Sequence, residues 1–134
     1  MPLYLLNTNI LTDLIKHPGG RVQKHIAEVG EENLCTSIVV ACELRFGARK
    51  KNAPVLTKRI EQLLQTIEVL PLTGDVDRTY AEVRTALEKK GRSIGANDLL
   101  IGSHALNERC VLVTHNGSEF AHIAGLKIED WLAD

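Results

Sequence analysis

Three carboxylates in this 134-residue chain lie in or beside apolar segments, where charged side chains are uncommon. Glu43 follows one apolar stretch, Asp98 precedes another, and Glu119 lies in the turn after a third. Carboxylates rarely occupy such positions unless something compensates their charge. If the three converge, a bound divalent cation would relieve their mutual repulsion. The sequence therefore suggests a metal site built from these three residues.

Asn7 stands at the end of the first apolar run, where a fourth ligand is expected, and it brings an oxygen without a charge. Oxygen ligands without a cysteine pair or a histidine cluster favour Mg²⁺ or Mn²⁺ over zinc. Such an ion can activate water and clamp a phosphodiester during in-line attack. The alternative is that Glu43 and Asp98 are ordinary surface or capping residues, since an acid near a helix start is favourable.

Short apolar segments alternate with amphipathic ones along the chain, as strands alternate with helices in α/β proteins. The predicted strands are residues 3–6, 34–36, 68–72, 111–114 and 127–128. The predicted helices lie between residues 9 and 18 and at about 21–29, 38–49, 54–67, 74–91 and 97–107. Apolar strands without alternation indicate a parallel sheet covered on both faces. We therefore predict one α/β domain over residues 1–134, with about five strands and with ligands beyond their carboxyl ends.

The composition argues against several classes of protein. The net charge is −1 and the aromatic content is 4%, which argues against a non-specific duplex-DNA coat and against an aromatic platform for single strands. The longest apolar runs, such as residues 38–42, are far shorter than the roughly 20 residues of a membrane helix. Three widely spaced cysteines do not form a disulfide framework. We expect a cytoplasmic protein without a membrane partner or a secretory signal.

Four ordered motifs resemble those of a known family. Residues 5–10 (LLNTNI) are close to the LLDTN opening of PIN-domain ribonucleases, and residues 43–47 resemble the E-L-x-x-G of the VapC toxins. Residues 91–98 (GRSIGAND) resemble their G-R-x-I-G-x-x-D segment. Residues 112–120 (LVTHNGSEF) resemble L-V-T-x-N-x-x-E-F, and the terminal segment 129–131 (EDW) fits as well. The resemblance spans nearly the whole chain.

The resemblance implies a PIN-domain fold and a toxin of a type II toxin–antitoxin pair that cleaves RNA with Mg²⁺ or Mn²⁺. The family's catalytic positions carry over onto Asn7, Glu43, Asp98 and the turn with Asn116 and Glu119, and all of these except Asn116 are expected to hold the metal. Proteins with this G-R-x-I-G stretch cut tRNA in the anticodon stem-loop, the initiator tRNA in particular. The resemblance also implies a homodimer and a larger complex with a VapB-type antitoxin, whose C-terminal segment blocks the active site.

Asn7 departs from the family pattern, which has an aspartate at this position. The change is nearly isosteric but removes one negative charge from the metal site. We therefore predict that the chain is catalytically impaired and that Asn7→Asp restores cleavage. An introduced inactivating change and a naturally degenerate copy are both compatible with this residue, and the intact remaining motifs favour the first. A catalytically inactive PIN module that binds and titrates an antitoxin is the alternative function.

Basic residues near the motifs are candidates for RNA contacts. Arg45 and Arg49 follow Glu43, and Arg92 precedes Asp98. Phosphate contacts of this kind would fix the register of an RNA without reading its sequence. The alternative is that they form ordinary solvated faces.

The segment 54–67 carries an apolar stripe at helical spacing. This stripe is either ordinary core or a groove for an antitoxin helix. Its members are Leu56, Ile60, Leu63 and Leu64.

Overall fold

The computed structural model describes residues 3–134, which form a five-stranded sheet in the order β3-β2-β1-β4-β5. Every neighbouring pair of strands is parallel. The strands are β1 (Tyr4–Leu6), β2 (Leu34–Ser37), β3 (Glu68–Leu70), β4 (Val111–Val113) and β5 (Ile128–Glu129). This parallel α/β arrangement confirms the predicted fold class.

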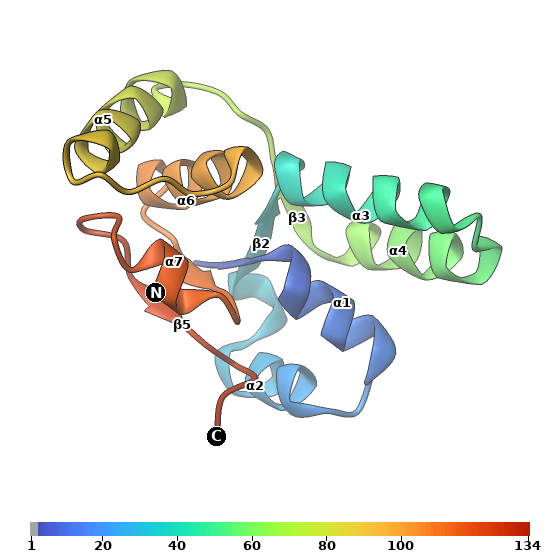
Figure 1. Cartoon of the computed structure of the whole chain (residues 1–134). Helices are drawn as coiled ribbons and strands as arrows, with labels where there is room; N and C mark the ends of the chain where they lie inside the picture. Colours follow the sequence, from blue (N-terminus) through green and yellow to red (C-terminus); the bar gives the residue numbers. More distant parts are fainter. Residues whose placement is uncertain (1–2) are drawn as a thin grey trace.

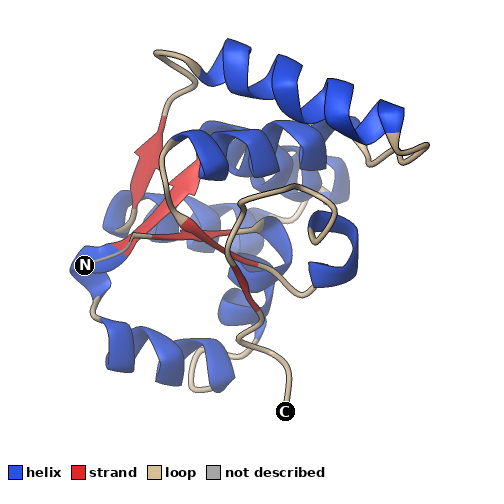
Figure 2. Ribbon diagram, turned by 90° about the vertical axis from the view of Figure 1, so that its left-hand side faces the viewer, coloured by secondary structure: helices blue, strands red, loops and turns tan. Residues whose placement is uncertain are grey.

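Helices lie on both sides of the sheet (Figures 1 and 2). They are α1 (Thr8–Lys16), α2 (Arg21–Val29), α3 (Ile38–Lys51), α4 (Pro54–Thr66), α5 (Val76–Lys89), α6 (Ala96–Asn107) and α7 (Gly117–Phe120), with a short 3-10 turn η1 (Glu31–Asn33). None of the helices within residues 3–134 is long and apolar enough to cross a membrane.

The two central strands form the middle of the core. Leu5, Leu6, Leu112 and Val113 are fully buried, because helices cover both faces of β1 and β4. A parallel sheet buried in this way needs continuous apolar strands instead of alternating ones, as the sequence has. The carboxyl ends of these strands open onto the same edge of the sheet, where the site residues begin.

The structure shifts some predicted boundaries. The third strand ends at Leu70 instead of residue 72, because Pro71 has no N–H to offer a sheet ladder. The last strand is Ile128–Glu129, one residue later than predicted. The sequence analysis did not predict α7 or the 3-10 turn, both of which are too short to show a helical period.

Helices α3 and α4 form a hairpin that extends away from the sheet, at the right of Figure 1. Asn52 ends α3 in the left-handed conformation with a φ of 50°, and Pro54 begins α4. Ile60 and Leu64 of the predicted stripe are buried, while Leu56 and Leu63 are partly buried against the same core. The stripe therefore packs largely as core.

A close approach of α6 to the segment after β4 positions one side of the site. A Cβ added at Gly102 would lie 2.6 Å from Ile123 Cδ1 and 3.3 Å from Phe120 Cδ1. Because glycine leaves this space free, α7 and the turn after it pack directly on α6. That packing places Glu119 of α7 beside Asp98 of α6.

Candidate active site

An open cleft of about 500 Å³ lies beyond the carboxyl ends of β1 and β4. Four of the five predicted catalytic residues border it, namely Asn7, Glu43, Asp98 and Asn116. The remaining wall is formed by Thr8, Asn9, Thr12, Asp13, Lys16, His115 and Leu132. The structure therefore brings together residues that are up to 109 positions apart in the sequence.

Asn7 is buried at the junction of β1 and α1, with 3% of its surface exposed. Its Oδ1 caps α1 by accepting from the Thr8 N–H at 2.8 Å, and its Nδ2 donates to Thr114 Oγ1 at 3.0 Å. Thr114 Oγ1 also accepts from the Asn116 N–H at 3.1 Å. Asn7 therefore ties the first helix to the turn after β4 and turns an amide N–H₂, instead of a carboxylate oxygen, toward Thr114.

Glu43 lies on α3, half-buried, with both carboxylate oxygens engaged. The Thr8 hydroxyl donates to Oε1, and Asn97 Nδ2 donates to Oε2 at 3.3 Å. These donors come from α1 and α6, the helices on either side of the cleft. These two bonds hold the carboxylate in one orientation. Binding of a ligand therefore does not have to pay the entropy of ordering this side chain.

Asp98 shows the strongest electrostatic strain of the site. Burial is the main cause that raises the pKa of Asp98 from 3.8 to about 6, followed by the negative charges of Glu119 and Glu43 and by a side-chain hydrogen bond with Glu119. A carboxyl surrounded in this way is stabilised by a proton or by a cation. Glu119 and Glu43 thus both act on Asp98.

Glu119 interacts with Asp98 from outside the cleft. It does not border the cleft, and its Oε1 accepts from the Gly95 N–H at 3.3 Å. This bond holds the start of α6 and thereby helps to position Asp98. Glu119 therefore has both a structural contact and an electrostatic one.

The donor chemistry of these residues fits a hard divalent cation, because every candidate ligand atom is an oxygen. In the part of the chain from residue 3 to 134, however, no three acidic, histidine or cysteine side chains have the spacing of a preformed metal group. Asn7, which also borders the cleft, contributes a neutral amide instead of an acid. Glu43 and Asp98, with Glu119 behind Asp98, are the residues that would hold such an ion.

Comparison with known proteins gives the family. The model of the PIN domain matches residues 4–126. The chain belongs to the PIN-domain family. It is 36% identical to Ribonuclease VapC2 of Rickettsia felis, over 96% of this chain and 98% of that one. It is 31% identical to the tRNA(fMet)-specific endonuclease VapC of Shigella flexneri, over 96% and 97% of the two chains.

A solved structure gives the same result. The crystal structure of VapBC2 from Rickettsia felis bound to a promoter DNA fragment superposes with a TM-score of 0.89 and 35% identity, covering 96% of this chain and 98% of that one. The predicted membership in the PIN domain and its VapC branch is confirmed.

Some residues that orient the cleft side chains were not selected by the sequence analysis. Thr8 and Asn97 donate hydrogen bonds to Glu43. Thr114 accepts hydrogen bonds from Asn7 and Asn116. Thr8 and Glu43 are 35 residues apart, so no local pattern pairs them. The signal that could have found Thr8 and Thr114 is their position directly after the first and fourth strands.

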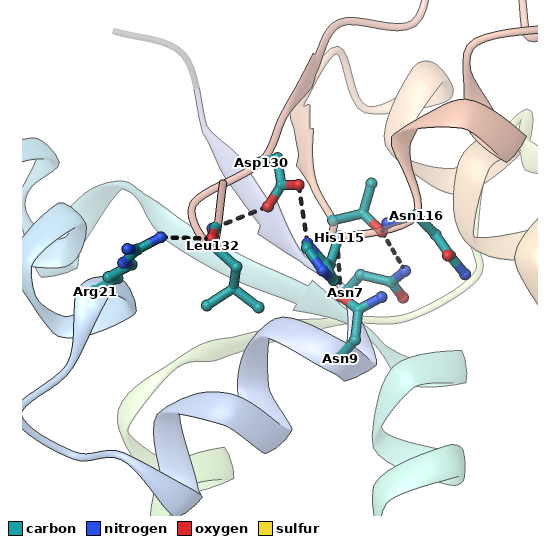
Figure 3. A network of polar contacts seen from close by, with 8 residues as sticks. Asn7, Asn9, Arg21, His115, Asn116, Asp130 and Leu132 are labelled. Carbon is teal, nitrogen blue, oxygen red and sulfur yellow. Dashed lines mark hydrogen bonds and ion pairs between the residues drawn. The ribbon is translucent and has the colours of Figure 1, made fainter. Parts of the chain in front are cut away.

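The C-terminal segment forms one rim of the cleft in this PIN domain (Figure 3). His115 Nδ1 bonds Asp130 Oδ2 at 2.9 Å, and its backbone N–H donates to Asn9 Oδ1 at 3.2 Å. Arg21 of α2 donates to the Leu132 carbonyl at 2.9 Å. These contacts fasten the chain end beside the cleft.

The three arginines proposed for RNA contact do not gather at the cleft of the PIN domain. Arg45 forms a two-bond ion pair with Glu61 at 2.9 and 2.8 Å, which raises the pKa of Arg45 and lowers the pKa of Glu61. Arg49 borders a separate groove of about 580 Å³ between α3 and α4. Arg92 is exposed on the loop before α6. None of the three borders the cleft.

Proposed function

We propose that this chain is the toxin of a VapBC-type pair and a metal-dependent endoribonuclease that cuts tRNA, the initiator tRNA in its anticodon stem-loop. The observation that carries the proposal is the cleft itself, where Asn7, Glu43, Asp98 and Asn116 converge and where burial and, after it, the neighbouring acids raise the pKa of Asp98. The VapC relatives are named ribonucleases, and the Shigella flexneri relative is named a tRNA(fMet)-specific endonuclease.

Each residue of the cleft has a distinct task in this reaction. Glu43, Asp98 and Glu119, with the Asn7 oxygen, would hold Mg²⁺ or Mn²⁺, which supplies positive charge for the phosphate under attack. Thr8 and Asn97 keep the Glu43 carboxylate pointed toward the cleft. Asn116, held through its N–H by Thr114, offers its amide to the RNA backbone at the mouth of the cleft.

Asn7 weakens the reaction in this proposal. Its Oδ1 already caps α1, and its Nδ2 donates to Thr114. An aspartate at this position keeps the cap, accepts from the Thr114 hydroxyl and adds the missing charge. We therefore expect the chain to be catalytically impaired as it stands.

The proposal includes a protein partner. The similar structure from Rickettsia felis is of VapBC2 bound to promoter DNA, and another neighbour is VapBC-1 from nontypeable Haemophilus influenzae. We propose a homodimer of this chain that joins a VapB-type antitoxin in a larger assembly in the cytoplasm. The alternative function, a module that only binds the antitoxin, is favoured by one observation: both ends of the Asn7 amide are engaged in structural bonds.

RNA contact outside the cleft is assigned to Arg92, Arg45 and Arg49. Each is exposed, and the guanidinium fork suits phosphate oxygens. Arg45 has to leave Glu61 or share its charge to do so, which makes Arg92 the clearest of the three to test.

Cleavage of total tRNA by the parent chain and by Asn7→Asp, each with Mg²⁺, with Mn²⁺ and with EDTA, tests the function. We expect discrete, EDTA-sensitive fragments from the aspartate variant and much less from the parent chain. Asn7→Asp combined with Glu43→Gln is the matched control and should be inactive. Equal cleavage by parent and Asn7→Asp would refute the role given to Asn7. No cleavage by either form, with intact antitoxin binding, would favour the binding-only module.

A further inference from the structure

One face of α3 carries three chemically different side chains in a row. Glu43, Phe46 and Lys50 are separated by three and four residues, so they share a face of the helix. At about 1.5 Å per residue, Phe46 lies roughly 4.5 Å and Lys50 roughly 10 Å beyond Glu43 along the axis. The face therefore leads from the acidic cleft to the outer end of the α3–α4 hairpin.

Phe46 is unusual for its exposure. It has 66% of its surface exposed, although the core buries most other large apolar side chains of the described chain. It lies one turn from Glu43, which borders the cleft. The low aromatic content argues against an extended stacking platform. One exposed ring beside the proposed RNA cleft can still stack a single unpaired base.

The hairpin end is positively charged. Arg49, Lys50 and Lys51 occupy the last turn of α3, and all three are exposed. Lys58 and Arg59 are exposed on the adjoining turns of α4. Over the described residues 3–134, these five cations make no ion pair, whereas Arg45 one turn earlier is paired with Glu61. In a protein with a net charge of −1, this is a concentrated positive end.

We propose that this face of α3 is the track for the RNA strand next to the cleaved bond. An unpaired base stacks on Phe46, and the following phosphates bind Lys50 and Lys51. The inference rests on the proposed RNA cleavage and specifies how the substrate is held. It selects for single-stranded RNA, because a base inside a duplex has no free face to offer the ring.

The neutral residue at position 7 makes the test direct, because binding can be measured on the parent chain with little cleavage. The probes are total tRNA and a fully paired RNA stem of similar length, titrated at several salt concentrations with EDTA present. We expect Phe46→Ala to weaken tRNA binding about tenfold and to leave stem binding unchanged, while Phe46→Tyr retains tRNA binding. Val55→Ala, which removes another exposed apolar side chain from the hairpin, is the control and should have no effect.

The cations are tested separately. Lys50→Gln with Lys51→Gln should weaken binding of both RNAs about tenfold and reduce the slope of log affinity against log salt by about 1 to 2. Lys24→Gln with Lys127→Gln removes two exposed lysines elsewhere and should leave the slope unchanged.

The outcomes separate this inference from the proposed function. Parent-like tRNA binding by both Phe46→Ala and the lysine pair would overturn the track and leave the nuclease proposal standing. A change in oligomeric mass or antitoxin binding with Phe46→Ala, without a change in RNA binding, would overturn it in favour of a protein interface. If the parent chain binds no tRNA at low salt, both proposals fail.

Discussion

The two ends of α3 differ in almost every physical property. The first turns are largely buried. Ser37 caps the helix by accepting from the Val39 N–H, and Val39, Val40 and Ala41 pack in the core. The last turn is exposed and carries three neighbouring cations. One helix therefore joins a rigid site for chemistry to a free, charged end suited to a polyanion.

This difference follows from what each end must do. A carboxylate proposed to hold a metal needs a fixed orientation, and two donors on neighbouring helices orient Glu43. Phosphate contacts need charge and reach more than a fixed position, which exposed lysines supply. Changes at the buried end should therefore affect the rate of cleavage, while changes at the exposed end should affect affinity.

The largest effect is expected from Asp98→Asn in the Asn7→Asp background. Cleavage should fall at least about 100-fold, because one charge of the metal site is lost. At pH 7 the ionised carboxyl lies close to Glu119 and Glu43, so its removal should raise the free energy of unfolding by about 1 kcal/mol.

Single-turnover cleavage and urea unfolding in EDTA measure the two quantities on the same samples. A variant that loses activity and stability together would show that Asp98 supports the fold more than the reaction. Asp77→Asn, an exposed acid in the first turn of α5, is the control and should change cleavage by less than about twofold.

The second effect concerns the donor to Glu43. Thr8→Val removes the hydroxyl that binds Oε1 and keeps the shape of the side chain. We expect a loss of about 10- to 100-fold in Mn²⁺ affinity and in cleavage, because the carboxylate is no longer held in place. Thr8→Ser keeps the hydroxyl and should restore most of both, whereas equal losses in the two variants would contradict this role. Calorimetric Mn²⁺ titration gives the affinity independently of activity.

The sequence predicted much of this architecture because the core is simple. Strands such as residues 111–113 are short, continuous and apolar, so their burial on both faces follows directly from composition. The positions after the first and fourth strands indicated where Asn7 and Asn116 meet. The apolar surroundings of Glu43 and Asp98 indicated that they belong to one site, and the family motifs gave the same prediction.

The rest depends on contacts between distant segments. No local pattern reports that Thr8 reaches Glu43, or that Glu119 holds Gly95 and lies behind Asp98 instead of lining the cleft. The ion pair of Arg45 with Glu61 forms only because α4 folds back along α3. Side-chain partners set by tertiary packing are the part that sequence patterns leave open.

A smaller effect is expected where α6 meets the buried end of α3. His104 is fully buried, and its Nδ1 lies 2.8 Å from Ser37 Oγ. Burial lowers the pKa of His104, so the neutral form is favoured in the folded state. Its contribution to stability is therefore present above about pH 6.5 and is lost as the pH falls toward the lower folded pKa.

Titration of His104 changes the free energy of unfolding by at most about 1.4 kcal/mol per pH unit. Urea unfolding of the parent chain and of His104→Gln at pH 7.5 and pH 5.5 isolates it, because the other titrating groups are common to both. The parent should lose more stability than the variant between the two pH values. Equal losses would show that His104 does not titrate with folding.

The smallest effect is expected at Arg45, which lies between the buried and the exposed end of α3. Glu61→Gln breaks the ion pair with Arg45 and leaves that guanidinium free beside the cationic last turn. Because the pair is exposed, the stability of the fold should change little. The added positive charge should increase tRNA affinity about threefold at low salt and by less at high salt. Glu82→Gln on α5 makes the same charge change away from the hairpin, so an equal gain there would assign the effect to net charge instead of to Arg45.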